Sequence, residues 1–182
     1  MTKWTPYIHK SQVFDLSHLD DFEHTFVQAA TATASAKHFL VSVIFTDHTF
    51  TDSSNEDNLL IYSKTHSREG IKNRYFNHKR WELSKLLPDL IRAFGESNKR
   101  FYVLPDGAYF RLELLDRQNQ KIEYDIFFDV VKVKRQTIMV VKSAYERDPN
   151  SNERPKLDRT NHFGFFKLHH ATNQGKRIHK RY

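Results

Sequence analysis

The sequence predicts an α+β fold in which a mostly antiparallel sheet packs against one central helix. Three patterns lead to this prediction: an early segment with apolar side chains at every second position, a central apolar stripe at helical spacing, and a late series of strand-like segments separated by short polar turns. We therefore expect an early strand pair and a late antiparallel meander, with the helix on one face of the sheet.

The early strand is predicted at residues 38–46, where Phe39, Val41, Val43 and Phe45 share one side. Residues 25–33 suit a hairpin partner for it, although the alanines nearby also suit a helix. Residues 13–22 alternate poorly and suggest a short lead-in strand followed by a turn. The polar residues 51–58 predict an exposed loop.

The central helix is predicted at residues 78–94, and Gly95 is placed to terminate it. Its apolar stripe consists of Leu83, Leu86, Leu87, Leu90, Ile91 and Phe94. Pro88 interrupts the stripe, and because proline removes a backbone donor, the helix should kink or divide there.

The late meander is predicted to contain three strand candidates: 100–104 running on to 108–115, then 121–134, then 137–145. The connections at 116–121 and 134–137 suit antiparallel hairpins. In the second candidate, Ile122, Tyr124, Ile126, Phe128 and Val130 share one face, and acidic residues populate the other. The apolar run at 163–168 suggests a last strand.

The composition places limits on both domain organisation and chemistry. A chain of 182 residues predicts one domain, at 1–173, followed by a mobile basic tail at 174–182. The absence of cysteine excludes disulfides, thiolate metal sites and cysteine nucleophiles. No signal core or membrane-length apolar run is present, so we expect a cytoplasmic protein with no membrane partner. The scattered glycines lack phosphate-loop spacing, and no cofactor is predicted.

Eleven histidines raise the question of a metal site. His48, His66 and His78 are widely spaced, and no His-Glu-x-x-His motif occurs. His169 and His170 are adjacent, which would point them apart on a strand. The sequence therefore predicts no metal ligands, with the histidines serving as surface or tail residues.

The positive charge of the chain is concentrated near its C-terminus. Residues 154–182 contain eight of the 29 Lys and Arg residues but only one of the 22 acidic residues, so residues 1–153 are neutral overall. A basic segment of this kind favours phosphate neutralisation. The candidate nucleic-acid contacts there are Lys176, Arg177, Lys180 and Arg181; the alternative is a solubilising terminus.

A second basic segment covers residues 64–80 and has six Lys and Arg residues against one acid. Tyr75 and Phe76 are interleaved with the cations, which suits phosphates and stacked bases. The candidate contacts are Lys72, Arg74, Tyr75, Lys79 and Arg80. The alternative is a solvated loop that leads into a helix.

The candidate catalytic residues lie where an apolar strand ends in Lys142, Ser143, Tyr145 and Arg147. A ribonuclease that works without metal needs a base for the 2′-hydroxyl, cations for the phosphate and an acid for the leaving oxygen. Lys, Arg, Tyr and His can fill these roles. The competing interpretation is an ordinary strand end, with the tyrosine packed at its rim.

The segment Val141, Ser143, Ala144 and Tyr145 has the form Val-x-Ser/Thr-Ala-Tyr. At the end of a late meander, it resembles the last strand of the barnase–EndoU–colicin–RelE superfamily of RNases; the likeness covers about residues 108–149. The chain is also similar to uncharacterised bacterial and prophage proteins.

The resemblance implies a small toxin-type endoribonuclease fold with Ser143 and Tyr145 on the active strand. Lys142 or Arg147 would lie beside them, and His48, His78 and Arg80 would be supporting candidates. The chain departs from the family pattern in its long N-terminal region and basic extension, and no catalytic histidine can be matched residue by residue.

The functional expectation is a nucleic-acid-directed protein of mobile-element or toxin–antitoxin type, with RNA as its target and metal-independent endoribonuclease activity. The alternative is a non-catalytic module that binds nucleic acid or a protein partner. An acidic protein partner, such as an antitoxin or phage factor, would require the same basic surface.

Overall fold

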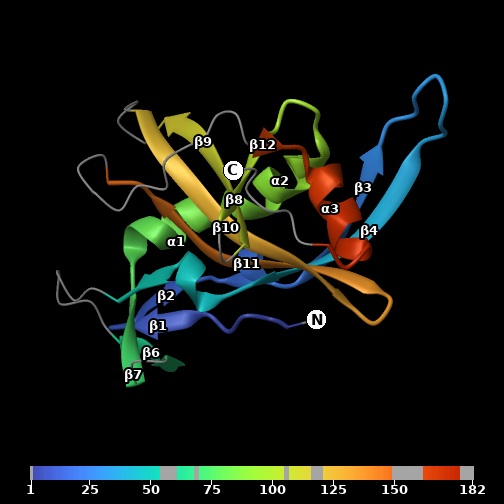
Figure 1. Ribbon diagram of the computed structural model, residues 1–182. Helices are drawn as coiled ribbons and strands as arrows, with labels where there is room; N and C mark the ends of the chain where they lie inside the picture. Colours follow the sequence, from blue (N-terminus) through green and yellow to red (C-terminus); the bar gives the residue numbers. More distant parts are fainter. Residues whose placement is uncertain are drawn as a thin grey trace.

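A computed structural model describes residues 2–53, 61–67, 70–104, 107–115, 121–148 and 162–176. The fold is α+β, as the sequence predicts, and its main element is a twisted seven-stranded sheet (Figure 1). In spatial order the strands are β12 (His162–Phe163), β8 (Phe101–Leu104), β9 (Gly107–Leu115), β10 (Lys121–Val133), β11 (Gln136–Glu146), β4 (Lys37–Phe45) and β3 (Phe22–Gln28).

The early strand pair and the late meander belong to the same sheet. β3 and β4 form an antiparallel pair, which resolves residues 25–33 in favour of strand at their start, and β9 to β11 form the expected antiparallel series. β8 does not run on into β9 as predicted but turns back and pairs antiparallel with it. A parallel pairing of β4 with β11, from Val41 opposite Thr137 to Phe45 opposite Val141, joins the two halves.

Two small sheets accompany the main one. β1 (Tyr7–His9) pairs with β2 (Gln12–Phe14), and β7 (Gly70–Phe76) pairs with both β5 (Thr51–Asp52) and β6 (Ile61–Ser67). The expected lead-in strand at 13–22 is thus limited to β2 and is followed by a short 3-10 helix, η1 (Ser17–Leu19).

Two loop predictions are corrected by β5, β6 and β7. The expected loop at 51–58 begins as strand, because Thr51 and Asp52 pair with Phe76 and Tyr75; residues 54–60 lie outside the described ranges. The loop alternative for residues 64–80 was wrong, because most of that segment pairs in the β6–β7 hairpin. Strand pairing over a distance in sequence outweighed the local polar composition.

The central helix is divided, as Pro88 suggests. α1 (His78–Ser84) is followed by α2 (Leu87–Arg92) and a 3-10 turn, η3 (Ala93–Gly95). Pro88 lies in the first turn of α2, where its missing N–H costs no helical hydrogen bond. Asn77 caps α1, since its side-chain oxygen accepts a hydrogen bond from the Arg80 N–H at 2.9 Å.

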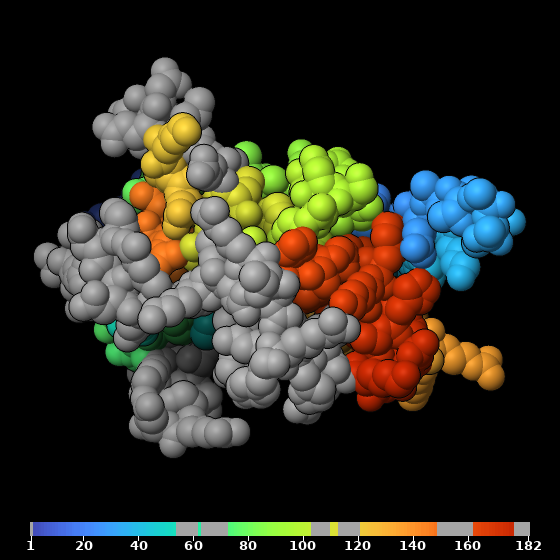
Figure 2. Space-filling view, turned by 45° about the horizontal axis from the view of Figure 1, so that its top comes forward, coloured from blue at the N-terminus to red at the C-terminus, as the bar shows by residue number. Residues whose placement is uncertain are grey.

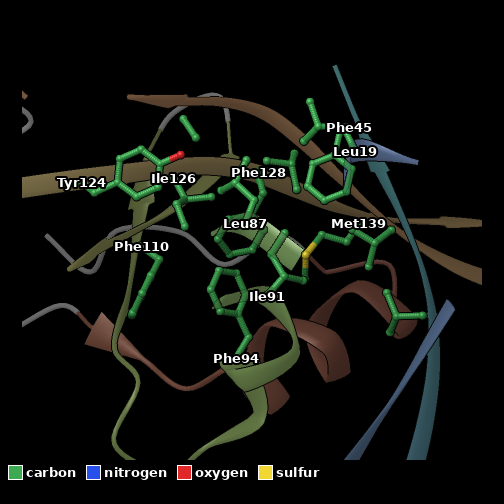
Figure 3. Close-up of a cluster of buried hydrophobic side chains, with 14 of the residues drawn as sticks. Leu19, Phe45, Leu87, Ile91, Phe94, Phe110, Tyr124, Ile126, Phe128 and Met139 are labelled. Carbon is green, nitrogen blue, oxygen red and sulfur yellow. The ribbon is translucent and has the colours of Figure 1, made fainter. Parts of the chain in front are cut away.

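The core lies between the helical segment and one face of the sheet. Figure 3 shows Leu87, Ile91 and Phe94 directed toward Phe128 and Met139 on the sheet, and all five side chains are fully buried. The Phe94 and Phe128 rings lie 5.3 Å apart. Burial of this aromatic and aliphatic surface is what fixes the helix to the sheet.

The prediction of a last strand at 163–168 was wrong beyond its first residue. Only β12 is strand, and Gly164 begins the helix α3 (Phe165–Asn173). Phe165 and His169 lie one turn apart and are both buried, so helical spacing places the apolar groups on the sheet side. His169 and His170 therefore lie on a helix rather than a strand. α3 lies close to the β3–β4 hairpin (Figure 2).

Candidate functional site

The candidate site begins with a bulge in β11. Phe127 lies opposite Ser143 but Phe128 lies opposite Val141, so Lys142 is an extra residue in the strand. Before the bulge Val141 faces the core, and after it Ala144 does. The bulge consequently places Ser143 and Tyr145 on the outer face of the sheet, away from α2 and α3.

An open hollow of about 370 Å³ lies between the end of β11 and the start of α1. Its lining residues come from β5, α1 and β11 with the residues that flank them: Asp52, Asn77, Lys79, Arg80, Leu83, Tyr145, Glu146, Arg147 and Asp148. The structure therefore brings together four residues that the sequence singled out, Lys79, Arg80, Tyr145 and Arg147, although they come from two distant segments.

Among the cations of the hollow, Arg147 has the clearest remaining capacity to donate hydrogen bonds to a bound anion. Its side chain is only 9% exposed, and its Nη1 lies 3.4 Å from the Glu123 carboxylate. Its Nη2 is buried and has no hydrogen-bond partner within the described ranges. A buried guanidinium nitrogen without an acceptor is costly, and an anion in the hollow would relieve that cost.

Arg80 and Arg74 hold the backbone that precedes the hollow. Arg80 Nη1 donates to the carbonyl oxygens of His48 and Thr51, at 3.2 and 2.8 Å, and its guanidinium lies 4.9 Å from the centre of the Tyr145 ring. Arg74 is buried and donates to the Thr51 carbonyl at 2.7 Å. Both arginines thus stabilise the turn η2 (Asp47–Thr49) and β5, and burial lowers the pKa of each.

Glu146 is a site residue that the sequence did not single out. Its carboxylate lies 2.6 Å from Lys79 Nζ, and its side chain is 21% exposed at the hollow. Tyr145 stacks on Phe127, with ring centres 5.3 Å apart. The position of Glu146 directly after Tyr145 was the available signal, but only the packing of α1 beside β11 shows that it meets Lys79.

The other predicted catalytic residues lie beside the hollow rather than in it. Ser143 Oγ donates to the His48 carbonyl at 3.4 Å, and Lys142 Nζ lies 3.0 Å from Asp129. The His48 ring is partly exposed, and its pKa is lowered mainly by burial and also by Arg74. His78 packs against Phe14 and Trp81, away from the hollow.

The remaining predicted nucleic-acid contacts are distributed more widely. Tyr75 lies on β7, where its hydroxyl accepts from Asn73 at 3.3 Å. Lys72 lies on the same strand, although its side chain is outside the described part, and Lys176 is exposed just after α3. Arg177, Lys180 and Arg181 lie outside the described residues.

Neither a metal cluster nor a membrane helix is found in the described ranges. No group of three His, Asp or Glu side chains there is arranged to hold a metal ion. No helix there is long and apolar enough to cross a membrane.

Comparison with known families assigns the chain. The model of the YjaZ family matches residues 6–173. The chain belongs to the YjaZ family. The matched range runs from just before β1 to the last residue of α3. All residues that line the hollow of this YjaZ-family protein therefore lie within the range that the family model matches. Neither the curated proteins nor the solved structures include a match.

Proposed function

We propose that the protein is a metal-independent endoribonuclease whose active site is the hollow between α1 and β11. The observation that carries this proposal is the buried Nη2 of Arg147, which has no hydrogen-bond partner among the described residues and lines the hollow with a carboxylate, Glu146, and a tyrosine, Tyr145. A guanidinium that can bind the phosphate, a carboxylate that can act as base and a hydroxyl that can act as acid are thus available at one place.

The proposed reaction uses the substrate's own 2′-hydroxyl as nucleophile. Glu146 takes the 2′-hydroxyl proton as the 2′-oxygen forms a bond to phosphorus, and the bond from phosphorus to the 5′-oxygen breaks. The products are a 2′,3′-cyclic phosphate and a 5′-hydroxyl, whose proton comes from the Tyr145 hydroxyl. Arg147 and Lys79 stabilise the negative charge that builds on the phosphoryl oxygens.

The mixed charge of the hollow favours catalysis over simple binding. Three carboxylates, those of Asp52, Glu146 and Asp148, line it together with the three cations. Carboxylates oppose phosphate binding, so a surface built only to hold RNA gains nothing from them. One of them can serve, however, as the base of a metal-free cleavage.

The resemblance of the strand that contains Val141, Ser143, Ala144 and Tyr145 to the barnase–EndoU–colicin–RelE superfamily supports the same proposal. The basic C-terminal segment adds sequence-independent affinity for the phosphate backbone. We expect it to strengthen RNA binding, while the chemistry resides at the end of β11.

The test is cleavage of labelled single-stranded RNA by the purified protein in EDTA. We expect a 2′,3′-cyclic phosphate product, and no cleavage at a nucleotide whose 2′-hydroxyl is replaced by hydrogen. Glu146→Gln and Tyr145→Phe keep the side-chain shape and should each slow cleavage by about 10²- to 10⁴-fold.

Glu96→Gln is the matched control for Glu146→Gln, because Glu96 also pairs with a lysine, Lys99, but at an exposed site away from the hollow. It should cleave like the unchanged protein. RNA binding without cleavage would identify a non-catalytic binding module instead, and cleavage that survives both substitutions would refute this site.

A further inference from the structure

A patch of aliphatic side chains lies exposed on the outer face of the sheet, at the end away from the hollow. It consists of Val27, Leu40, Val131, Val133 and Ile138, here called the outer-face patch. Leu40 is 57% exposed, Val27 50%, Val133 48% and Val131 39%. The alternation of each strand sets these residues opposite the core-facing positions, so α2 and α3 do not cover them.

The patch spans several neighbouring strands. Val131 on β10 lies directly opposite the half-buried Ile138 on β11, which in turn lies opposite Ser42 on β4. Leu40 is two residues from Ser42 on the same face, and Val27 on β3 lies opposite His38, so Ile138, Leu40 and Val27 are diagonal neighbours with Ser42 and His38 between them.

Exposed cations lie at one end of the patch. Lys134 and Arg135 are exposed in the turn between β10 and β11, next to Val133, and no ion pair to either of them is found within the described residues. Lys37 and Lys132 are exposed nearby, but alternation directs them to the other face of the sheet. Figures 1 and 2 show both hairpins projecting from the body of the molecule, with α3 close by. An aliphatic surface that ends in exposed cations is complementary to a partner that is both apolar and acidic.

We propose that the outer-face patch binds an amphipathic, acidic helix of another protein. β4 and β11 have hydrogen-bonded neighbours on both sides over the patch, so a partner on this face must bind through side chains rather than as an added strand. A helix is the element that packs on the face of a sheet in this way.

The composition of the patch disfavours two other occupants. Its side chains are aliphatic, whereas unpaired nucleic-acid bases are recognised by aromatic stacking. A second copy of this chain would present the same patch, whose own residues include no carboxylate to pair with Lys134 and Arg135.

This inference is independent of the proposed ribonuclease. The hollow lies at Tyr145 to Asp148, beyond the bulge, whereas the patch begins at Ile138 on the same strand. Both sites can be occupied at once, and either one can be disproved without the other.

The test uses the full chain and a fluorescein-labelled helical peptide of 18 residues, with leucines at helical spacing on one face and glutamates on the other. Fluorescence anisotropy should show saturable binding. Leu40→Ser and Val131→Ser should each weaken it at least about 10-fold, because each removes buried apolar contact. The pair Lys134→Glu with Arg135→Glu should weaken it further at low salt.

Three controls make the result decisive. Ile8→Ser, at a 66% exposed position on β1, should bind like the unchanged protein. A peptide with glutamates replaced by lysines, and one with the same residues in scrambled order, should not bind. The proposal is overturned by equal binding of these peptides, or by unchanged binding to the Leu40→Ser variant. Loss of RNA affinity or of self-association in that variant would overturn it in favour of RNA or of a second copy.

Discussion

At the scale of single residues, the position of Arg147 depends on a network of charges on β9 and β10. Arg111 Nε and Nη2 bind the two oxygens of Asp125, at 2.6 and 2.7 Å, and Asp125 is almost fully buried. The Glu123 carboxylate lies 3.5 Å from Arg111 Nη1 and 3.4 Å from Arg147 Nη1. Arg111 and Asp125 thus fix Glu123, and Glu123 orients the guanidinium at the hollow.

Asp125→Asn is predicted to lower the free energy of unfolding by about 3 kcal/mol, because the largely buried Arg111 loses its close carboxylate and keeps only the longer contact with the half-exposed Glu123. Urea denaturation measures this change. Asp89→Asn is the control, since Asp89 also pairs with an arginine, Arg92, but is 91% exposed. That change should cost less than about 0.5 kcal/mol, and equal losses for both variants would contradict a special role for the buried pair.

At the scale of secondary-structure elements, the bulge at Lys142 determines what the end of β11 presents. If the same residues formed a regular strand with Lys142 paired, Ser143 and Tyr145 would point toward the core and Ala144 outward, because a shift of one residue moves every side chain to the other face. The Lys142 carbonyl accepts a hydrogen bond from Thr46 Oγ1 at 2.7 Å, which anchors the bulge where β4 ends.

Insertion of one alanine between Phe127 and Phe128 on β10 is predicted to lower the free energy of unfolding by about 2 kcal/mol or more. The insertion gives Lys142 a pairing partner and removes the bulge, so that regular alternation from Val141 drives the Tyr145 hydroxyl toward the apolar core. It should also abolish RNA cleavage. Lys142→Ala keeps the extra residue and loses a partly exposed ion pair with Asp129, so it should change stability by less than about 1 kcal/mol. Equal stability of the two variants, from thermal or urea unfolding, would show that the bulge is dispensable.

At the scale of the whole molecule, the parallel pairing of β4 and β11 unites segments about 95 residues apart. The buried residues of both halves form one cluster, in which Val41 and Val43 lie with Met139 and Val141. Neither half of the sheet can bury its apolar face alone, so we expect the two halves to unfold together.

Unfolding in urea is therefore predicted to be a single transition. Fluorescence of Trp4 and Trp81 reports on the N-terminal segment and α1, and far-ultraviolet circular dichroism reports on the sheet, so the two signals should give the same midpoint. Met139→Ala should shift both midpoints together and cost about 2–5 kcal/mol, as expected for a fully buried side chain. Separate midpoints would show that the two halves are independent units.

Patterns that depend on neighbours in the chain were predictable from the sequence. Local spacing predicts the period-two alternation of β4 and β10, the apolar stripe divided near Pro88 and the hairpins of the meander. Each of these patterns depends only on the order of residues within one segment or between two adjacent ones. The terminal residues 163–168 were the exception, since a short apolar run is compatible with both strand and helix.

What the sequence by itself determined about this protein is its α+β class and its divided central helix. Only the tertiary structure decided that β4 joins β11 in parallel, that Lys142 is a bulge, and that Lys79 meets Glu146 while Arg74 and Arg80 bind carbonyl oxygens. The physical reason is that local periodicity fixes which face of a segment is apolar. The neighbour of a polar side chain depends instead on strand order and register, and these are set by pairing between segments that are far apart in the chain.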